Sequence, residues 1–213
     1  MRCIVLFVLG LAILMALPHL VVPTDSGALP KLGVAGGDGA GDEPDRGDST
    51  GAEPPIHGPV PDARILVFKS ERRLELYSGD QMLRRWPVIL GPKPRGDKRV
   101  EGDGRTPEGE YYICVRNSRS RYHLSLGLSY PNVEDAERGL EEGLIDEEEA
   151  DRIIRANMQG RVPPWYTALG GEIFIRGPGE EGELTGGSIA LARAHIEELF
   201  LAVSGGTPVV IYP

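Results

Sequence analysis

The chain has few of the side chains from which metal sites and disulfides are built. Its 213 residues include two cysteines, Cys3 and Cys114, and four histidines that lie far apart in the sequence. No cysteine–histidine cluster has the spacing of a zinc site, so we expect no bound metal and no cofactor. Cys3 lies in an N-terminal apolar segment. The rest of the chain therefore has one thiol and no internal disulfide.

Basic residues are also scarce. Lys and Arg number 23 against 32 Asp and Glu, which gives a formal net charge of −9. Proteins that bind nucleic acids need a basic surface to neutralise phosphates. The chain has no phosphate-binding loop either, so we expect no nucleic-acid partner.

The N-terminal segment, residues 1–23, has the pattern of an export signal or a membrane anchor. Arg2 precedes an apolar run over residues 4–17, which continues at 20–22. No clear small-x-small cleavage site follows, and Cys3 lies too early for a lipoprotein signal. Both a cleaved signal peptide and an uncleaved anchor remain open. Either one predicts a location in the cell envelope, periplasmic or extracellular.

Residues 24–62 form a predicted linker. The segment contains nine Gly and six Pro in 39 residues, with eight acidic residues against two basic ones. Such a composition buries too little apolar area to offset the entropy of ordering, so we expect a disordered tether. As a flexible coil its ends lie about 35 Å apart.

The remaining residues, 63–213, have the pattern of a mainly β domain. Short runs of β-branched and aromatic residues alternate with Gly/Pro turns. The expected strands cover residues 65–68, 74–77, 86–90, 111–115, 122–128, 171–175 and 208–212. The expected helices cover 134–143, 146–158 and 189–203, and the first two form a hairpin within an insert at 134–159. Asp146 and Glu149 have the spacing of a capping box for the second helix.

One short segment has the pattern of an active-site turn. An apolar strand at residues 173–177 is followed, after an acidic loop, by Thr185, Gly186, Gly187 and Ser188. The pattern predicts a Gly-Gly turn that presents the Ser188 hydroxyl at the start of a helix. Backbone amides at such a turn stabilise developing negative charge.

The same segment resembles the catalytic motif of the L,D-transpeptidase (YkuD-type) family, and other stretches match in order and spacing. They are residues 69–77, 91, 96–98, 101–109, 123–132, 163–165, 169–171, 196–200 and 206–209. The resemblance spans nearly all of 64–211. It implies an L,D-transpeptidase-like β-sandwich with a helical-hairpin insert and a C-terminal helix. It also implies a bacterial envelope protein that cross-links or trims peptidoglycan stem peptides.

The chain departs from the family at its two reactive positions. Members carry histidine where this chain has Arg176, and cysteine where it has Ser188. A serine hydroxyl is a poor nucleophile without a positioned base, and a guanidinium stays protonated at biological pH. We therefore expect a catalytically impaired site. Gly177, Thr185, Gly186 and Gly187 are candidate substrate-binding or oxyanion residues beside these positions. Trp165 is a candidate groove residue, because aromatic residues in loops are more often exposed to ligands.

No substitute base or nucleophile is evident in the sequence. His195 follows Ser188 by seven residues, about 10 Å along a helix axis, which is too far for direct proton transfer. His123 and Cys114 lie in predicted strands, where we expect a structural histidine and an inert thiol. Asp103 and Glu108 are candidate groove carboxylates, although solvated turn charges are the simpler interpretation.

Several functions remain compatible with these residues. Arg176 and the turn amides suit a stem-peptide carboxylate, which favours a protein that binds wall peptides or modulates active relatives. Alternatively, Arg176 pairs with an acidic residue of the following loop, namely Glu180, Glu181 or Glu183, and closes the groove. Two further alternatives are an active serine-dependent transpeptidase or carboxypeptidase and a structural envelope protein that binds nothing.

Overall fold

The computed structural model describes residues 54–179 and 185–213. The leader at 1–23, most of the predicted linker, and the three acidic candidates for pairing with Arg176 lie outside the described residues. Within these two ranges, no helix is long and apolar enough to cross a membrane.

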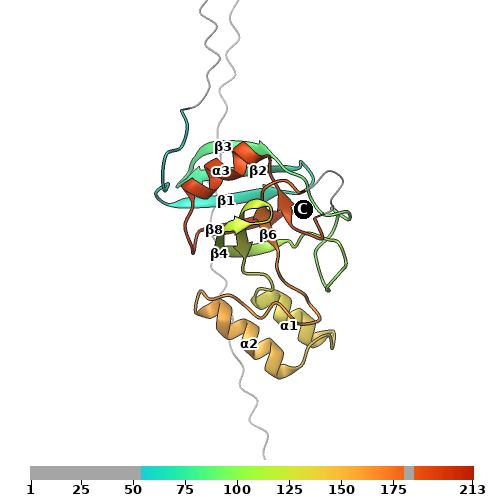
Figure 1. Ribbon diagram of the computed structural model, residues 1–213. Coiled ribbons are helices and arrows are strands. Elements are labelled where there is room, and N and C mark those ends of the chain that lie inside the picture. Colours follow the sequence, from blue (N-terminus) through green and yellow to red (C-terminus); the bar gives the residue numbers. More distant parts are fainter. Residues whose placement is uncertain (1–53, 180–184) are drawn as a thin grey trace, which may run out of the picture. The chain divides into compact units, whose positions relative to one another are not determined.

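The described chain forms one mixed sheet of eight strands. Its strands are β1 (Ala63–Phe68), β2 (Arg73–Ser78), β3 (Gln81–Pro87), β4 (Gly109–Ser120), β5 (His123–Leu128), β6 (Phe174–Arg176), β7 (Ile189–Ala190) and β8 (Pro208–Tyr212). They are arranged in the order β3-β2-β1-β8-β4-β5-β6-β7 (Figure 1). The prediction of a mainly β domain is therefore confirmed.

The long strand β4 lets the sheet curl. Its first residues, from Gly109, pair with β8, while its later residues, from Ile113, pair with β5. At the other end of the sheet, Ile89 and Ala190 exchange two backbone hydrogen bonds of 2.9 and 2.8 Å. This bridge joins the segment after β3 to β7. The two edges of the sheet therefore meet, and the sheet wraps around its core as a curled half-barrel.

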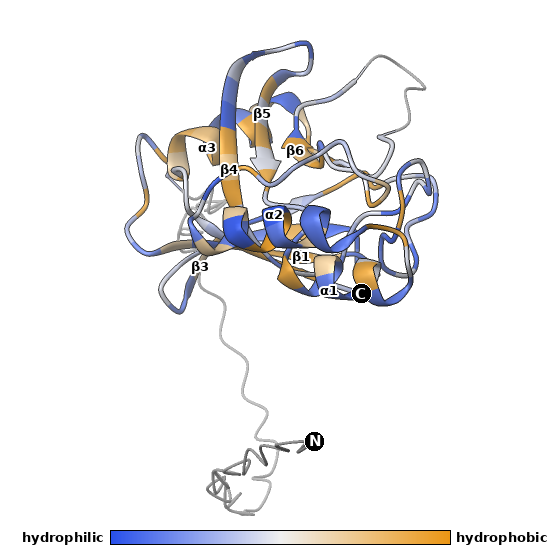
Figure 2. Cartoon of the chain, turned by 90° about the horizontal axis from the view of Figure 1, so that it is seen from below, coloured by the Kyte–Doolittle hydropathy of each residue, from blue (hydrophilic) through white to orange (hydrophobic). Residues whose placement is uncertain are grey.

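Alternating apolar residues build the core inside this curl. Ile65 and Val67 of β1, Leu126 of β5 and Ile175 of β6 are all fully buried in one cluster. Side chains two residues apart share one face of a strand, so each strand contributes a row of them. The inner parts of β4 and β5 are apolar, while the tip of their hairpin is polar (Figure 2). The helix α3 (Arg193–Ala202) covers the cluster.

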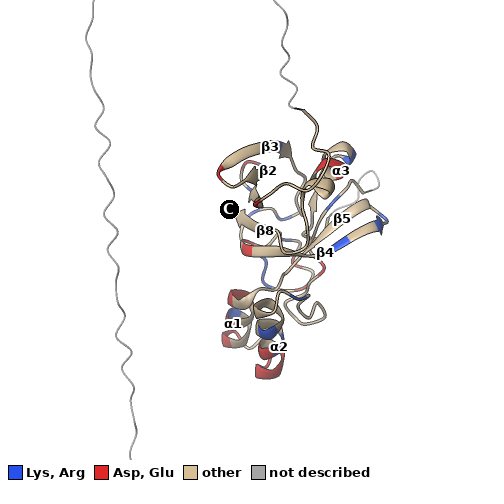
Figure 3. Cartoon of the chain, turned by 90° about the vertical axis from the view of Figure 1, so that its left-hand side faces the viewer, with Lys and Arg blue, Asp and Glu red and all other residues tan. Residues whose placement is uncertain are grey.

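The predicted helical hairpin is present as α1 (Val133–Glu141) and α2 (Glu147–Met158). Asp146 and Glu149 form the expected capping box, and Asn132 forms a second one at the start of α1. The hairpin has a small core of its own, which includes Ile153 and Leu169. Acidic residues cluster on both helices (Figure 3). The helix caps and the apolar face of the two helices therefore explain why the insert folds as a hairpin.

Two predicted boundaries were wrong. The last helix was expected over 189–203, but Ile189–Ala190 forms β7 and the helix begins at Arg193. The parallel neighbour β6 gives these two residues strand partners, and this tertiary pairing overrides their helical pattern. The strand expected over 86–90 instead covers Gln81–Pro87, because the two-residue turn after Ser78 starts the next strand at once.

Candidate functional site

The pairing of β6 with β7 brings Arg176 and Ser188 to one face of the sheet. The two strands run parallel, with Ile175 opposite Ile189 and Arg176 opposite Ala190. Ser188 precedes Ala190 by two residues, so its side chain lies on the same face as that of Arg176. The fold therefore places the two positions that the resemblance assigns to reactive groups on one face of the β6–β7 pair.

The Ser188 hydroxyl is held by the backbone and has no base beside it. Ser188 is 7 % exposed, and its Oγ accepts a hydrogen bond of 3.1 Å from the Phe174 amide. Its own amide donates to the Thr185 carbonyl oxygen at 3.1 Å. In the described part of the chain, no side-chain acceptor lies within hydrogen-bonding distance of the hydroxyl.

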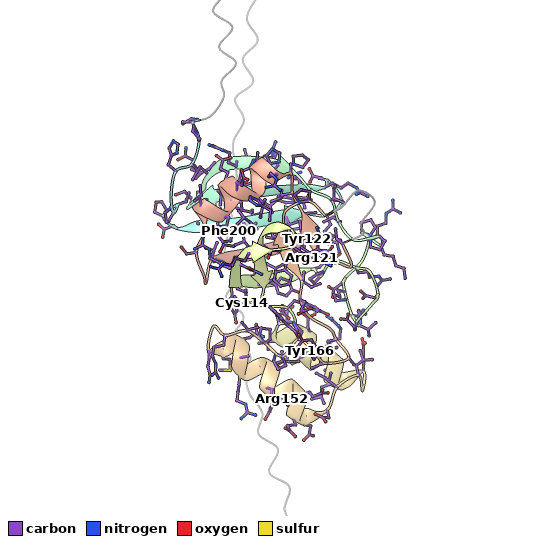
Figure 4. The ribbon with its side chains drawn as sticks, viewed as in Figure 1. Cys114, Arg121, Tyr122, Arg152, Tyr166 and Phe200 are labelled. Atoms are coloured by element: carbon purple, nitrogen blue, oxygen red, sulfur yellow. The ribbon has the colours of Figure 1, made fainter. Side chains whose placement is uncertain are left out.

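The Arg176 guanidinium lies inside the protein. Arg176 is 2 % exposed, its Cζ lies 3.6 Å from the centre of the Tyr122 ring, and its Nη1 donates to the Gly177 carbonyl oxygen at 3.1 Å. Figure 4 labels Tyr122 beside Arg121, which contacts the same ring at 4.6 Å. A buried guanidinium packed on an aromatic face favours a structural role over the carboxylate-binding role that the sequence suggested.

Gly177 is required by close packing. A Cβ at this position would lie 2.2 Å from the Tyr122 carbonyl oxygen, and the Gly177 amide donates to Leu124 at 3.0 Å. The residue therefore seats the end of β6 against the start of β5. This contact supports the position of Arg176.

The Gly-Gly turn is shaped by its neighbours and lies away from any helix start. Gly187 has a φ of 119°, and a Cβ there would lie 2.5 Å from the Arg105 carbonyl oxygen. Its amide points towards Thr185 Oγ1 at 3.4 Å. Because α3 begins five residues after Ser188, the predicted helix N-terminus at this turn was wrong. The turn therefore has no helix dipole behind it to favour negative charge.

Thr106 is a site residue to which the sequence assigned no role of its own. Its side chain is fully buried, and its Oγ1 donates to the Gly187 carbonyl oxygen at 2.8 Å. The backbone oxygen of Thr106 accepts a bond of 2.7 Å from Lys69 Nζ, which also donates to Gly96 and Glu108 at 2.7 Å each. The Thr-Pro-Glu-Gly motif at 106–109 was the available signal. It marks the loop that holds the turn in place.

Trp165 lies next to the strand that positions Ser188. Its ring makes an edge contact with Phe174 at 5.7 Å, and its Nε1 is buried without a hydrogen-bond partner among the described residues. A Cβ on Gly171 would clash with Trp165, so the close approach requires that glycine. The neighbouring Tyr166 is 89 % exposed. Trp165 thus supports the site while Tyr166 faces solvent.

The other candidate groups do not reach Ser188. His123 Nε2 lies 2.7 Å from Glu197 Oε1, and His195 stacks on Trp86 at 5.9 Å. Burial raises the pKa of the Cys114 thiol to about 12. Among the residues described, no group of three His, Cys, Asp or Glu side chains is arranged to hold a metal ion.

Two further carboxylates are held by their own loop. Asp103 Oδ1 accepts from Lys98 Nζ at 3.1 Å and from the Arg105 amide at 3.0 Å. Burial opposes ionisation of Asp103, but the amides of Arg99 and Arg105 and the Lys98 ammonium outweigh it and lower its pKa. Glu108 is bound to Lys69. Both carboxylates therefore shape the loop before β4.

Comparisons with known proteins agree with this architecture. The model of the L,D-transpeptidase catalytic domain family (YkuD) matches residues 62–211. A comparison with curated protein sequences gave no significant match. Among solved structures, the helical cell shape determining protein Pgp2 from Campylobacter jejuni is 24% identical, with a TM-score of 0.48, over 70% of this chain and 46% of that one.

Two other solved structures are also similar. Bd1075 from Bdellovibrio bacteriovorus is 21% identical, with a TM-score of 0.47, over 74% of this chain and 51% of that one. L,D-transpeptidase 1 from Mycobacterium tuberculosis is 12% identical, with a TM-score of 0.41, over 71% and 62%. The chain thus spans about half to three fifths of the length of these proteins. Because the family model covers more than two thirds of the chain, the chain belongs to the L,D-transpeptidase catalytic domain family.

Proposed function

We propose that this chain acts at peptidoglycan in the bacterial cell envelope as an L,D-transpeptidase-type domain that has lost most or all of its catalytic power. It binds wall stem peptides or modulates active members of the family. In this proposal, residues 1–23 export or anchor the chain, and residues 24–62 tether the domain at 63–213.

The contacts of Ser188 carry the proposal. Acyl transfer by a hydroxyl needs a group that takes its proton as it attacks. Among the described residues, Ser188 Oγ accepts one hydrogen bond, from the Phe174 amide, which is a donor and cannot accept that proton. Arg176, at the position of the family's histidine, is a permanent cation buried against Tyr122. A serine nucleophile at this site therefore lacks its base.

The intact surroundings support retention of a binding role. Thr106 still ties the Gly187 turn to the loop before β4, and Trp165 still packs beside Phe174. In this proposal, these contacts hold the turn and the strand beside which the family's substrates react. Retention of these supporting contacts without the reactive groups favours a role in holding a peptide.

The test compares four proteins on purified peptidoglycan: the wild type, Ser188→Cys, Arg176→His and the double variant. Muropeptide products are separated by chromatography and identified by mass. We expect no products from the wild type, and 3→3 cross-links or trimmed stems from the double variant alone. New products from the wild type, lost in Ser188→Ala, would instead establish a serine enzyme.

Sedimentation with isolated cell wall tests the binding half of the proposal. The wild type should co-sediment with wall, and soluble stem tetrapeptide should compete. Trp165→Ala, checked for folding by circular dichroism, should weaken the association, whereas Met158→Ala on the exposed end of α2 should not. If the folded wild type stays in the supernatant, the chain is a structural protein and the binding role is rejected.

A further inference from the structure

A hollow lies beside Lys69, whose Nζ binds the Thr106 carbonyl oxygen at 2.7 Å. It has a volume of about 390 Å³ and is bordered by the turn between β1 and β2 and by the loop that precedes β4. Its charged lining residues are Lys69, Arg72, Arg95 and Glu108. We call it the arginine pocket. Its volume falls in the range of small-ligand sites.

Two guanidinium groups of the pocket have no ion-pair partner in the described part of the chain. Lys69 and Glu108 neutralise each other through a bond of 2.7 Å, and the remaining donors of Lys69 are used by Gly96 and Thr106. The side chains of Arg72 and Arg95 have no hydrogen-bond or ion-pair partner among the described residues. The charged side chains of the lining therefore sum to +2, in a chain with a net charge of −9.

The backbone around both arginines is held in place by the same buried lysine. The Arg72 amide donates to the Lys69 carbonyl oxygen at 3.2 Å, and the Arg72 carbonyl accepts from Val88 at 2.8 Å. Arg95 precedes Gly96, whose carbonyl is bound by Lys69 Nζ. The two guanidiniums thus project from segments that are already ordered, which lowers the entropy cost of binding a ligand between them.

We propose that the arginine pocket binds a small anion with at least two carboxylate or phosphate groups. Each guanidinium presents a planar fork that matches one such group through two parallel hydrogen bonds. A single carboxylate engages one fork only, so the site discriminates in favour of multiply charged ligands. This inference is independent of the role proposed for Ser188.

The pocket is also connected to the Gly-Gly turn. Lys69 Nζ binds the Thr106 carbonyl, and Thr106 Oγ1 binds the Gly187 carbonyl. A ligand bound beside Lys69 changes the electric field along this short chain of hydrogen bonds. We therefore expect amide signals of Thr106 and Gly187 to shift on binding, although neither residue lines the pocket.

The experiment is calorimetric titration of the folded protein with citrate and with pyrophosphate, using acetate as the singly charged comparison. The variants are Arg72→Gln and Arg95→Gln. Arg119→Gln is the matched control, because it removes one exposed arginine charge outside the pocket. Each pocket variant should weaken binding of the multiply charged ligands about tenfold, and the control less than twofold.

The outcomes distinguish a carboxylate ligand from a phosphate ligand and test the proposal. Tighter binding of citrate identifies a polycarboxylate site, and tighter binding of pyrophosphate identifies a phosphate site. If neither ligand binds more tightly than acetate, or if Arg119→Gln weakens binding as much as the pocket variants, the proposal is overturned. A failure here leaves the muropeptide and sedimentation results unaffected.

Discussion

At the scale of single residues, the contact between Arg176 and Tyr122 has the largest effect on the chemistry of the candidate site. A cation on an aromatic face contributes about 0.5–2 kcal/mol, more when it is shielded from water. The contact keeps the guanidinium inside the protein, where a smaller imidazole leaves space unfilled. Arg176→His alone should therefore lower stability, and activity in the double variant has to be compared at equal folded fraction.

A second prediction for a single residue concerns the reactivity of the Cys114 thiol. Burial raises the pKa of its thiol to about 12, so very little thiolate exists near pH 8. In a Cys3→Ser form of the chain, alkylation of native protein by iodoacetamide should be roughly a thousandfold slower than that of an exposed thiol. Mass spectrometry over time measures the rate. The denatured protein serves as the control, and equal native and denatured rates would contradict the prediction.

At the scale of secondary structure, local signals determine the helical hairpin well. Asp146 accepts from the Glu149 amide at 2.8 Å, as the capping-box pattern predicts. By contrast, β7 was missed because two residues carry too little local pattern to predict a strand. Ile189 and Ala190 are strand residues only because β6 lies beside them.

The cap of α2 can be tested directly. Asp146→Ala removes the side-chain acceptor and should lower the free energy of unfolding by about 1 kcal/mol. Asp146→Asn keeps an acceptor and should cost only a few tenths of that amount. Urea unfolding followed by circular dichroism measures both. Equal losses in the two variants would show that charge, and not the capping bond, is responsible.

At the scale of the whole molecule, buried carboxylates link stability to pH. Burial alone raises the pKa of Glu75, but hydrogen bonds from Tyr77, Arg73 and Arg85 outweigh it and hold the pKa below its usual value of 4.5. The folded state therefore favours the ionised form. This stabilisation is complete above the unfolded pKa and is lost as the pH falls through the folded pKa. The pKa of Asp103 is also lowered, so its contribution to stability is lost in the same way as the pH falls.

The resulting prediction concerns thermal unfolding between about pH 6 and pH 3. The wild type should lose stability below about pH 4.5, and Glu75→Gln should be less stable at neutral pH but less sensitive to acid. Asp80→Asn changes an exposed ion pair with Arg64 and should keep the wild-type slope. Asp135 makes the opposite contribution to stability. Burial raises its pKa, so this contribution is lost as the pH rises. A Glu75→Gln slope equal to the wild type would contradict this account.

The amino-acid sequence by itself determined the family, most strands, the capped hairpin and the absence of a cysteine and histidine at 188 and 176. These features depend on residue identity and on short-range spacing. Only the tertiary structure decided that Arg176 is buried on Tyr122, that Thr106 holds the turn at Gly187, and that two guanidiniums share one pocket. Thr106 and Gly187 lie 81 positions apart, and no local pattern specifies a contact at that separation. Such contacts arise only when the sheet curls and brings distant loops together.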